Sequence, residues 1–232
     1  MIESYKNKLF SVLGDSISTL SGYSEPDYAA FYEGEIKYKS GVFAPEDTWW
    51  GQVIERLGGE LLVNNSYSCS IVCKHPECEV PSYGCSDERT AALARGGFSP
   101  DVVMIFMGMN DWGRGILPWP EGEGKERGLA VFYTAYEDML AKICANYPRA
   151  ELWCFTLPVS ICTKKESFAF PYRFGGRHIE EYCEVIRACA AKRGCRVIDL
   201  YRAGKPHDTI DGFHPNAEGM KTLAEAVMEI LE

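Results

Sequence analysis

The sequence has no apolar run long enough to cross a lipid bilayer. The longest, Val102–Met107, contains six residues, whereas a membrane-spanning helix needs about 20. The first residues also lack the basic, apolar and small-residue zones of a signal peptide. We therefore expect a cytoplasmic protein without a membrane span, in which Val102–Met107 is a buried strand.

Positive charge is also scarce. Lys and Arg number 24 against 33 Asp and Glu in 232 residues, which gives a net charge of −9 at pH 7. This sign argues against nucleic acid and anionic membrane surfaces as partners. The 46% hydrophobic and 25% charged residues are typical of an ordinary globular protein, which excludes low-complexity and disordered classes. We expect a small, weakly charged substrate, while the length alone allows one domain or two.

Short apolar stretches alternate with helix-like segments along the whole chain. Continuous apolar runs of this length are typical of parallel strands buried on both faces, so the alternation predicts an α/β fold with helices on both sides of a mostly parallel sheet. The expected strands are Leu9–Leu13, Leu61–Val63, Val102–Met107, Leu152–Leu157 and Val197–Leu200. The expected helices are one capped by Thr48 and ending at Leu57, one capped by Ser86 or Asp87 and ending at Arg95, and the segments Leu129–Asn146, His178–Arg193 and Asn216–Leu231.

Two segments, Gly22–Asp47 and Gly113–Gly128, do not fit this alternation. Both are rich in Gly, Pro, aromatic and acidic residues, and each follows the carboxyl end of an expected strand. Ligands bind at that edge in open α/β sheets. We interpret the two segments as loops that shape a substrate site, with a purely structural role as the alternative.

The first expected strand is followed by Gly14-Asp15-Ser16-Ile17-Ser18. This position places the Ser16 hydroxyl at the carboxyl edge of the sheet, where the start of a helix can supply N–H groups to a developing anion. The tripeptide Gly-Asp-Ser alone is a weak signal. The alternative is that Ser16 or Ser18 only caps a helix.

A histidine with a nearby carboxylate precedes the last helix, in Asp211-Gly212-Phe213-His214-Pro215. We expect Pro215 at the first helical position, which would hold His214 on the turn before the helix. Asp211 can accept the Nδ1–H of His214 and leave Nε2 available to take a proton from a hydroxyl. The segment therefore predicts a general base with its orienting carboxylate. His207 is a rival base, but it lacks this Asp and Pro framing.

A third motif, Gly108-Met109-Asn110-Asp111, closes the third expected strand. An Asn at this edge can point its amide N–H₂ into the cleft that holds Ser16 and donate to an oxyanion. Taken alone the motif also fits a simple turn. Together, however, the three motifs place a hydroxyl, an amide donor and a base at one edge of the sheet.

These motifs resemble those of the SGNH, or GDSL-type, esterase and lipase family: a Ser in Gly-Asp-Ser, a Gly, an Asn in Gly-x-Asn-Asp and a His in Asp-x-x-His-Pro. They follow the family's order from Gly14 to Pro215, nearly the whole chain. The resemblance implies a three-layer α/β/α sandwich with a five-stranded, flavodoxin-like sheet, and ester hydrolysis through an acyl-enzyme without metal or organic cofactor. Because Ser16 and His214 are 198 residues apart and must meet in one site, we expect a single domain over residues 1–232.

By this resemblance Ser16 is the nucleophile, His214 the general base and then acid, and Asp211 its orienting carboxylate. The oxyanion hole would combine the Asn110 side chain with the backbone N–H of Ser16. The family's glycine, a third donor through its backbone N–H, corresponds to Cys69. That N–H survives the change of side chain, but a positive φ at Cys69 would carry strain of about 1 kcal/mol or more.

Ten cysteines are many for a reduced compartment. Cys69, Cys73, Cys78 and Cys85, with His75 among them, fall within 17 residues and offer a zinc site as an alternative. The intervening stretches of three, four and six residues contain no Cys-x-x-Cys pair, which disfavours zinc. A disulfide and free thiols both remain open for this cluster. The other six are interpreted as buried small hydrophobic residues: Cys144, Cys154, Cys162, Cys183, Cys189 and Cys195.

Several further side chains near the motifs have expected roles. Asp15 and Asp111 are expected to hold their turns by accepting backbone N–H groups, and Trp49 and Trp50 are expected in the core. Residues on the loops after the third and fourth strands could line an acyl or alcohol pocket, or only pack those loops: Trp112, Trp119, Tyr172, Arg173 and Phe174.

We interpret the protein as a serine esterase for small-molecule esters, short-acyl and acetylated carbohydrate esters included. The lack of a long apolar lid favours short acyl groups. One alternative is a thioesterase or lysophospholipase with the same triad. Another is a catalytically silent module that binds glycans through Trp112 and Trp119. Neither the exact substrate nor the oligomeric state follows from the sequence.

Overall fold

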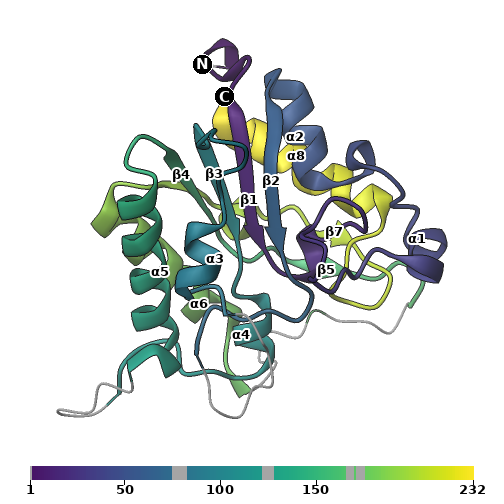
Figure 1. Cartoon of the computed structure of the whole chain (residues 1–232). Coiled ribbons are helices and arrows are strands. Elements are labelled where there is room, and N and C mark those ends of the chain that lie inside the picture. Colours follow the sequence, from purple (N-terminus) through teal and green to yellow (C-terminus); the bar gives the residue numbers. More distant parts are fainter. Residues whose placement is uncertain (1, 75–82, 122–127, 166–169, 171–175) are drawn as a thin grey trace.

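The computed structural model describes residues 2–74, 83–121, 128–165, 170 and 176–232. Its centre is a parallel five-stranded sheet in the order β2-β1-β3-β4-β6, with helices on both faces (Figure 1). This confirms the expected α/β/α arrangement. The strands are β1 (Leu9–Gly14), β2 (Glu60–Ser66), β3 (Val102–Phe106), β4 (Glu151–Phe155) and β6 (Arg196–Ile198).

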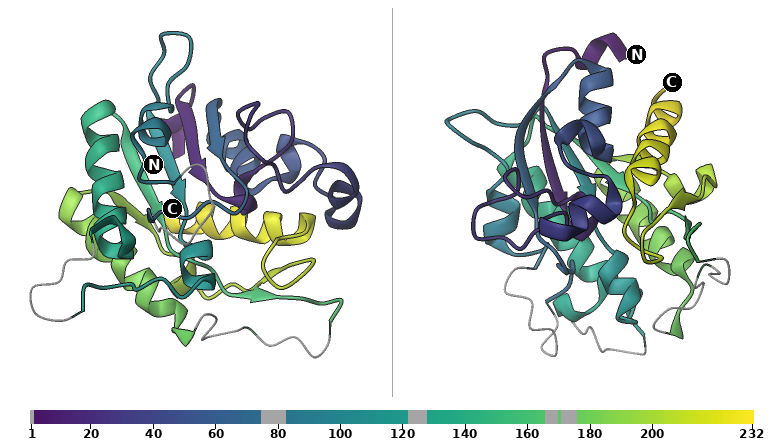
Figure 2. Two further views of the ribbon diagram at one scale, coloured as in Figure 1. Left: turned by 60° about the horizontal axis from the view of Figure 1, so that its bottom comes forward. Right: turned by 90° about the vertical axis from the view of Figure 1, so that its right-hand side faces the viewer.

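Two groups of helices cover the sheet. The views of Figures 1 and 2 show α2 (Trp49–Leu57) and α8 (Ala217–Leu231, yellow) together on one face. The other face carries α3 (Asp87–Ala91), α5 (Phe132–Asn146) and α6 (Ile179–Arg193). Shorter elements lie between these: α1 (Gly34–Ser40), α4 (Met109–Gly113), α7 (Leu200–Ala203) and the 3-10 turns η1 (Ile2–Tyr5), η2 (Ser16–Ser18), η3 (Pro45–Asp47) and η4 (Gly128–Ala130).

The register of the sheet brings the ends of three strands to one edge. Gly14, the last residue of β1, pairs with Ser66 of β2 and with Phe106 of β3. The segments that follow these strands therefore leave the sheet side by side, at the lower edge in Figure 1. The N- and C-termini lie at the opposite, upper edge.

A second, two-stranded sheet was not expected from the sequence. It pairs β5 (Ser160–Ile161) with β7 (His207–Asp208) in parallel. Strands of two residues are too short to give a periodic pattern, so the sequence does not predict them. This sheet precedes the turn that carries His214, and it ties that turn to the segment after β4.

Several expected boundaries are wrong, including the end of the strand placed at Leu157 and the start of the helix placed at Leu129, and two others show a physical reason. The helix expected to end at Arg95 ends at Ala91, because the N–H of Leu93 donates to the Tyr147 hydroxyl at 2.9 Å instead of continuing the helix. The strand expected to include Leu200 ends at Ile198, and Leu200 begins α7, capped by the Asp199 side chain. In both places a tertiary contact or a cap overrides the apolar pattern.

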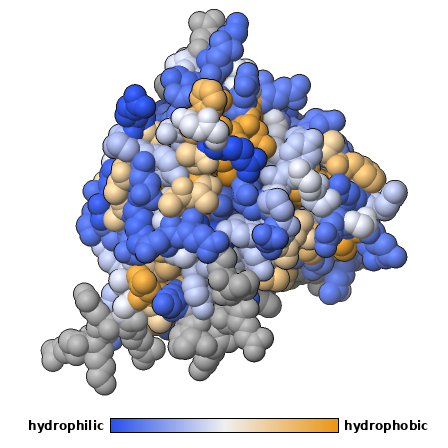
Figure 3. All heavy atoms as spheres, in the orientation of Figure 1, coloured by the Kyte–Doolittle hydropathy of each residue, from blue (hydrophilic) through white to orange (hydrophobic). Residues whose placement is uncertain are grey.

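The core contains the two tryptophans at the start of α2, as expected: both Trp49 and Trp50 are buried. Their indole N–H groups donate to the Ser18 hydroxyl at 3.2 Å and to the Ser18 carbonyl at 3.0 Å. On the face seen in Figure 3, hydrophobic residues form small separate patches among hydrophilic ones. None of the helices within the described ranges is both long and apolar enough to cross a membrane.

Candidate active site

Ser16 lies at the first position of η2, directly beyond the end of β1. Gly14 is required two residues earlier, since a Cβ there would lie 2.6 Å from the Cβ of Ser18 and 2.7 Å from the Oγ of Ser66. Because glycine has no side chain, Ser18 and Ser66 can pack this close to it. The chain can then turn directly after β1, with Ser16 at the edge of the sheet. The glycine of Gly-Asp-Ser is therefore explained by packing.

Asp15 stabilises this turn through its side chain. Its carboxylate caps η2 by accepting the N–H of Ile17 at 3.0 Å, as expected for a structural role. The side chain is buried, and burial raises the pKa of Asp15 to about 7, against the opposing influence of the Ile17 N–H and of His214. A carboxyl group with an unusually high pKa thus lies next to Ser16 in the chain.

The structure brings Ser16, His214 and Asp211 into one hydrogen-bonded chain. The Nε2 of His214 lies 2.9 Å from the Oγ of Ser16, and its Nδ1 lies 2.7 Å from Oδ2 of Asp211. Burial alone would raise the pKa of Asp211, but hydrogen bonds from His214 and from the Phe213 N–H lower it below its ordinary value. An imidazole held in this way can take a proton from the hydroxyl through Nε2 while the carboxylate stabilises the resulting cation.

The turn that carries His214 is closed by its own hydrogen bonds. Oδ1 of Asp211 accepts the His214 N–H at 2.8 Å, and the Ile210 N–H donates to the His214 carbonyl at 2.9 Å. Pro215 does not occupy the first helical position, which is a correction: Asn216 is the N-cap of α8 and Ala217 is its first residue. His214 still lies before the helix, because the turn and the Asn216 cap fix it there.

Two aromatic residues of the Gly22–Asp47 segment also hold His214, which the sequence motifs did not indicate. The ring of Phe31 stacks on the imidazole, with centroids 3.5 Å apart and planes 12° apart. The neighbouring Tyr32 donates its hydroxyl to the carbonyl of Pro215 at 2.8 Å. Phe31 comes from a loop far away in the sequence and belongs to no local motif, so only the fold reveals its role.

Asn110 lies in the first turn of α4, not at the end of the preceding strand. Gly108 caps this helix with a φ of 122°, a conformation open to glycine, and a Cβ there would lie 2.9 Å from the ring of Phe132. One hydrogen of the Asn110 amide goes to the carbonyl of Ser70 at 2.9 Å. Because the NH₂ group has two hydrogens, the second can donate to an oxyanion.

Asp111, next to Asn110, fixes the same region from inside. Its carboxylate accepts the N–H groups of Val72 and Cys73 from the segment after β2, at 2.9 and 3.2 Å. Burial raises the pKa of Asp111, and these N–H groups oppose the rise. Asp111 thus has the expected structural role, and its contacts also join α4 to the residues that follow Cys69.

Cys69 has a φ of 64°, which places it in the left-handed region that favours glycine. The side chain is exposed, and its carbonyl accepts a hydrogen bond from Arg114 at 3.3 Å. The backbone conformation thus matches the demand of a glycine position, although the residue is cysteine.

A cavity of about 150 Å³ opens beside Ser16 and His214. Trp112, expected on its surface, is instead fully buried, with its indole N–H on the Arg177 carbonyl at 3.0 Å and its ring near that of Phe213. Trp119 stacks on Tyr133, away from the cavity wall. Arg173 and Phe174, like Tyr172, lie outside the described residues. The cavity is lined by Ser16, Ile17, Met109, Asn110, Gly113, Phe213 and His214.

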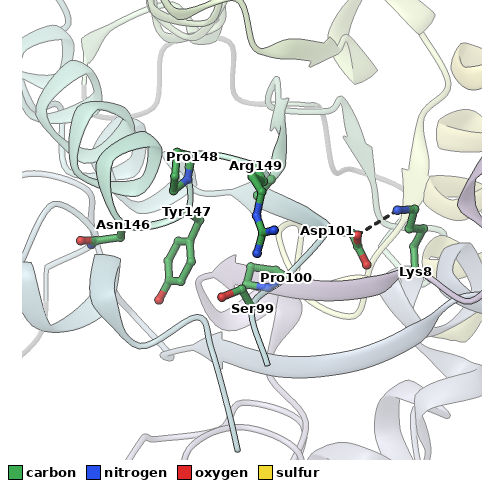
Figure 4. Close-up of a pocket in the computed structure, with 9 residues that line it drawn as sticks. Lys8, Ser99, Pro100, Asp101, Asn146, Tyr147, Pro148 and Arg149 are labelled. Carbon is green, nitrogen blue, oxygen red and sulfur yellow. Dashed lines mark hydrogen bonds and ion pairs between the residues drawn. The ribbon is translucent and has the colours of Figure 1, made fainter. Parts of the chain in front are cut away.

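A larger cavity, of about 500 Å³, lies at the opposite edge of the sheet (Figure 4). Its wall includes Lys8, which pairs with Asp101 at 2.9 Å, and Arg149. The described residues that line it include no histidine, and its Lys8 and Asp101 pair with each other. The hydrogen-bonded pair of Ser16 and His214 borders the smaller cavity.

The rival base does not line the smaller cavity, and the cysteine cluster is described only in part. His207 is buried in β7 with Nδ1 against the Val159 carbonyl at 2.9 Å, and burial lowers its pKa to about 4. In the loop cluster, Cys69, Cys73 and Cys85 carry free thiols, while His75 and Cys78 lie outside the described residues.

Comparisons with known proteins assign the chain to a family. The family model for GDSL-like Lipase/Acylhydrolase matches residues 8–160, well over half of the chain and inclusive of Ser16 and Asn110. Asp211 and His214 lie beyond the matched residues, and the fold brings them to Ser16. No curated protein matches the sequence.

Solved structures resemble the chain over nearly its whole length. A candidate GDSL-like lipase from Bacteroides uniformis is 27% identical with a TM-score of 0.72, covering 97% of this chain and 95% of that one. Another from Bacteroides ovatus is 24% identical with a TM-score of 0.72, covering 97% and 98%. A carbohydrate acetylesterase from Sinorhizobium meliloti shares the fold at 16% identity, with a TM-score of 0.62 and coverage of 97% and 98%. The chain belongs to the GDSL-like lipase/acylhydrolase family.

Proposed function

We propose that the protein is a serine esterase that hydrolyses carboxylic esters of short acyl groups, with Ser16 as nucleophile. The observation that carries the proposal is the hydrogen-bonded chain from Asp211 through His214 to Ser16 at the mouth of a cavity. Membership of the GDSL-like family supports ester hydrolysis as the reaction.

In the proposed reaction, the Oγ of Ser16 attacks the ester carbonyl as His214 takes its proton through Nε2. The carbonyl oxygen becomes an oxyanion that the second N–H of Asn110 and the backbone N–H groups of Ser16 and Cys69 stabilise. His214 then gives the proton to the departing alcohol, which leaves an acyl group on Ser16. A water molecule, deprotonated by His214, attacks this acyl-enzyme and releases the acid.

The size of the cavity supports a short acyl group. About 150 Å³ is well below the roughly 300–1,000 Å³ of pockets that enclose drug-sized ligands. The wall beside Ser16 is largely apolar, with Ile17, Met109 and Phe213 facing the space. An acetyl group fits this description, and acetylated carbohydrates are a natural test because a structural relative is a carbohydrate acetylesterase.

A fluorophosphonate probe tests the nucleophile directly. We expect one probe adduct on the folded wild-type protein, mapped to Ser16 by peptide mass spectrometry, and none on Ser16→Ala. Ser21→Ala, a change on the same loop away from the triad, serves as the matched control and keeps the adduct. Hydrolysis of nitrophenyl esters with two to twelve acyl carbons should fall steeply with chain length. An unlabelled wild-type protein, or activity retained in Ser16→Ala, would contradict the proposal.

A further inference from the structure

Arg89 is a fully buried cation close to the candidate site. It lies on α3, and its side chain has no exposed surface. Among the described residues, none of the ion pairs includes its guanidinium, and Asp15 acts on it only from beyond ion-pair distance. A charge buried without an opposite charge is costly unless its donors are satisfied by hydrogen bonds.

Neutral oxygens from three segments satisfy these donors. Nη1 donates to the Ser70 hydroxyl at 2.9 Å, and Nη2 donates to the carbonyls of Gly14 at 3.0 Å and Asn65 at 2.8 Å. Nε donates to the side-chain oxygen of Asn65. The guanidinium carbon also lies 5.5 Å from the centre of the Tyr28 ring. Burial lowers the pKa of Arg89 to about 10, so the group stays charged at neutral pH.

The partners of Arg89 adjoin the proposed oxyanion donors. Gly14 precedes Ser16 by two residues, and Ser70 directly follows Cys69. The carbonyl of the same Ser70 accepts the Asn110 amide at 2.9 Å. One guanidinium thus connects the end of β1 to the turn that supports the other two donors.

We propose that Arg89 is a positioning residue of the oxyanion hole, whose planar fork fixes Gly14 and Ser70 so that the donors of Ser16, Cys69 and Asn110 converge on one point. The inference rests on the proposed function. A planar guanidinium suits this task because its five N–H donors keep a rigid geometry, which the single ammonium of lysine cannot reproduce. The buried positive charge also favours an oxyanion over the neutral ester, because electrostatic interactions are strong where water is excluded.

Kinetics of Arg89→Met, Arg89→Lys and Ser70→Ala test the proposal. We expect Arg89→Met to lower kcat about 100-fold, comparable to the loss of one oxyanion donor, with KM changed less than about threefold. Arg89→Lys keeps the charge without the fork and should lose about tenfold in kcat. Ser70→Ala removes one hydrogen bond, and its effect should shrink when it is combined with Arg89→Lys, because both changes break the same contact.

Arg187→Met is the matched control for stability. Arg187 is another largely buried arginine, which lies on α6 and pairs with Glu180, Glu184 and Asp199. We expect Arg187→Met to lower Tm while kcat at a permissive temperature stays within about twofold. If Arg89→Met does not fold, Arg89→Lys and Ser70→Ala decide the question, since each retains part of the network.

The rate of fluorophosphonate labelling at Ser16 separates this inference from the proposed function. A labelled wild-type protein with slower labelling in the Arg89 variants supports both. Equal labelling rates and equal kcat in wild type, Arg89→Lys and Ser70→Ala would overturn the proposed role of Arg89 but not the proposed esterase function. A wild-type protein without labelling or esterase activity would overturn the proposed function and this inference with it.

Discussion

The ring of Phe31 lies flat against the imidazole of His214, with centroids 3.5 Å apart. Phe31 is itself held by Thr19, whose Oγ1 accepts the Phe31 N–H at 2.8 Å. The hydroxyl of Thr19 in turn donates to the carbonyl of Ser16 at 2.9 Å. The two members of the proposed nucleophile and base pair are therefore connected twice, by their own hydrogen bond and through Thr19 and Phe31.

Loss of the stacked ring should slow the reaction. In Phe31→Ala the imidazole can rotate away from the Ser16 Oγ, and small misplacements of reacting groups are costly. We expect kcat to fall about 10- to 100-fold, with a smaller change in KM, measured on a nitrophenyl acetate. Phe43→Ala is the control, because Phe43 is an exposed phenylalanine of the same Gly22–Asp47 segment, and its kcat should match that of wild type. Unchanged kcat in Phe31→Ala would show that the Asp211 contact alone orients His214.

The proposed triad could be anticipated from the sequence because each of its members lies in a short local motif. Asp211 and His214 are three residues apart on one turn, so their contact follows from spacing. Ser16 was placed by the strand before it, since parallel strands end at a common edge. Phe31 and Arg89 could not be found in this way. Each reaches the site through side-chain contacts that span the fold, and neither stands in a motif, although Phe31 lies in the Gly22–Asp47 segment that the sequence indicated as a site loop.

Trp112 illustrates the same limit in the opposite direction. An aromatic residue just after a strand at the ligand edge was a reasonable candidate for the pocket wall, but the short helix α4 turns its side chain inward. The helix begins at Met109 because Gly108 adopts a positive φ, and a single glycine does not reveal its φ in the sequence. The wall falls instead to Met109 and Gly113 of this helix and to Phe213.

Replacement of the orienting carboxylate should impair catalysis strongly. Asp211→Asn keeps the shape of the side chain, but its amide can present an N–H to Nδ1 and favour the wrong tautomer of His214. We expect kcat to fall about 10³- to 10⁴-fold, as measured by steady-state hydrolysis. Asp208→Asn removes a neighbouring carboxylate that contacts Thr163 and Asn216, and its kcat should stay within about tenfold of wild type. Equal losses in the two variants would contradict a specific role for Asp211.

Asp15 should make stability depend on pH. Its pKa is raised by burial to about 7 in the folded protein, from an ordinary value of 3.8. Between these values the folded state holds a proton that the unfolded state releases, so stability falls as pH rises from about 4 to about 7. The full cost above this window is about 4 kcal/mol.

Asp15→Asn cannot ionise but keeps an oxygen for the Ile17 N–H. We therefore expect the variant to exceed wild type in stability at pH 7.5, with the difference narrowing toward pH 4, in urea unfolding across that range. The depressed pKa of His207, about 4 because of burial, acts in the opposite direction below pH 6.5. It is present in both proteins and cancels in the difference. If the difference in the free energy of unfolding between the variant and wild type does not change with pH, the pKa of Asp15 is not raised in the folded protein as described.

The last prediction concerns Cys69, where the backbone favours glycine but the side chain is cysteine. A residue with a Cβ pays roughly 1–2 kcal/mol in the left-handed region, whereas glycine at ordinary positions is less stable than alanine because the unfolded chain gains freedom. Both Cys69→Gly and Cys69→Ala remove the thiol, and only the alanine variant retains the strain at a φ of 64°. We expect Cys69→Gly to exceed Cys69→Ala by about 1 kcal/mol in the free energy of unfolding, the reverse of the usual order. Asn7, the other described non-glycine residue with positive φ, offers Asn7→Gly and Asn7→Ala as a matched pair far from the site. Because the proposed donor is the backbone N–H, kcat should stay within about threefold in Cys69→Gly, and a large loss there would show that the thiol itself takes part.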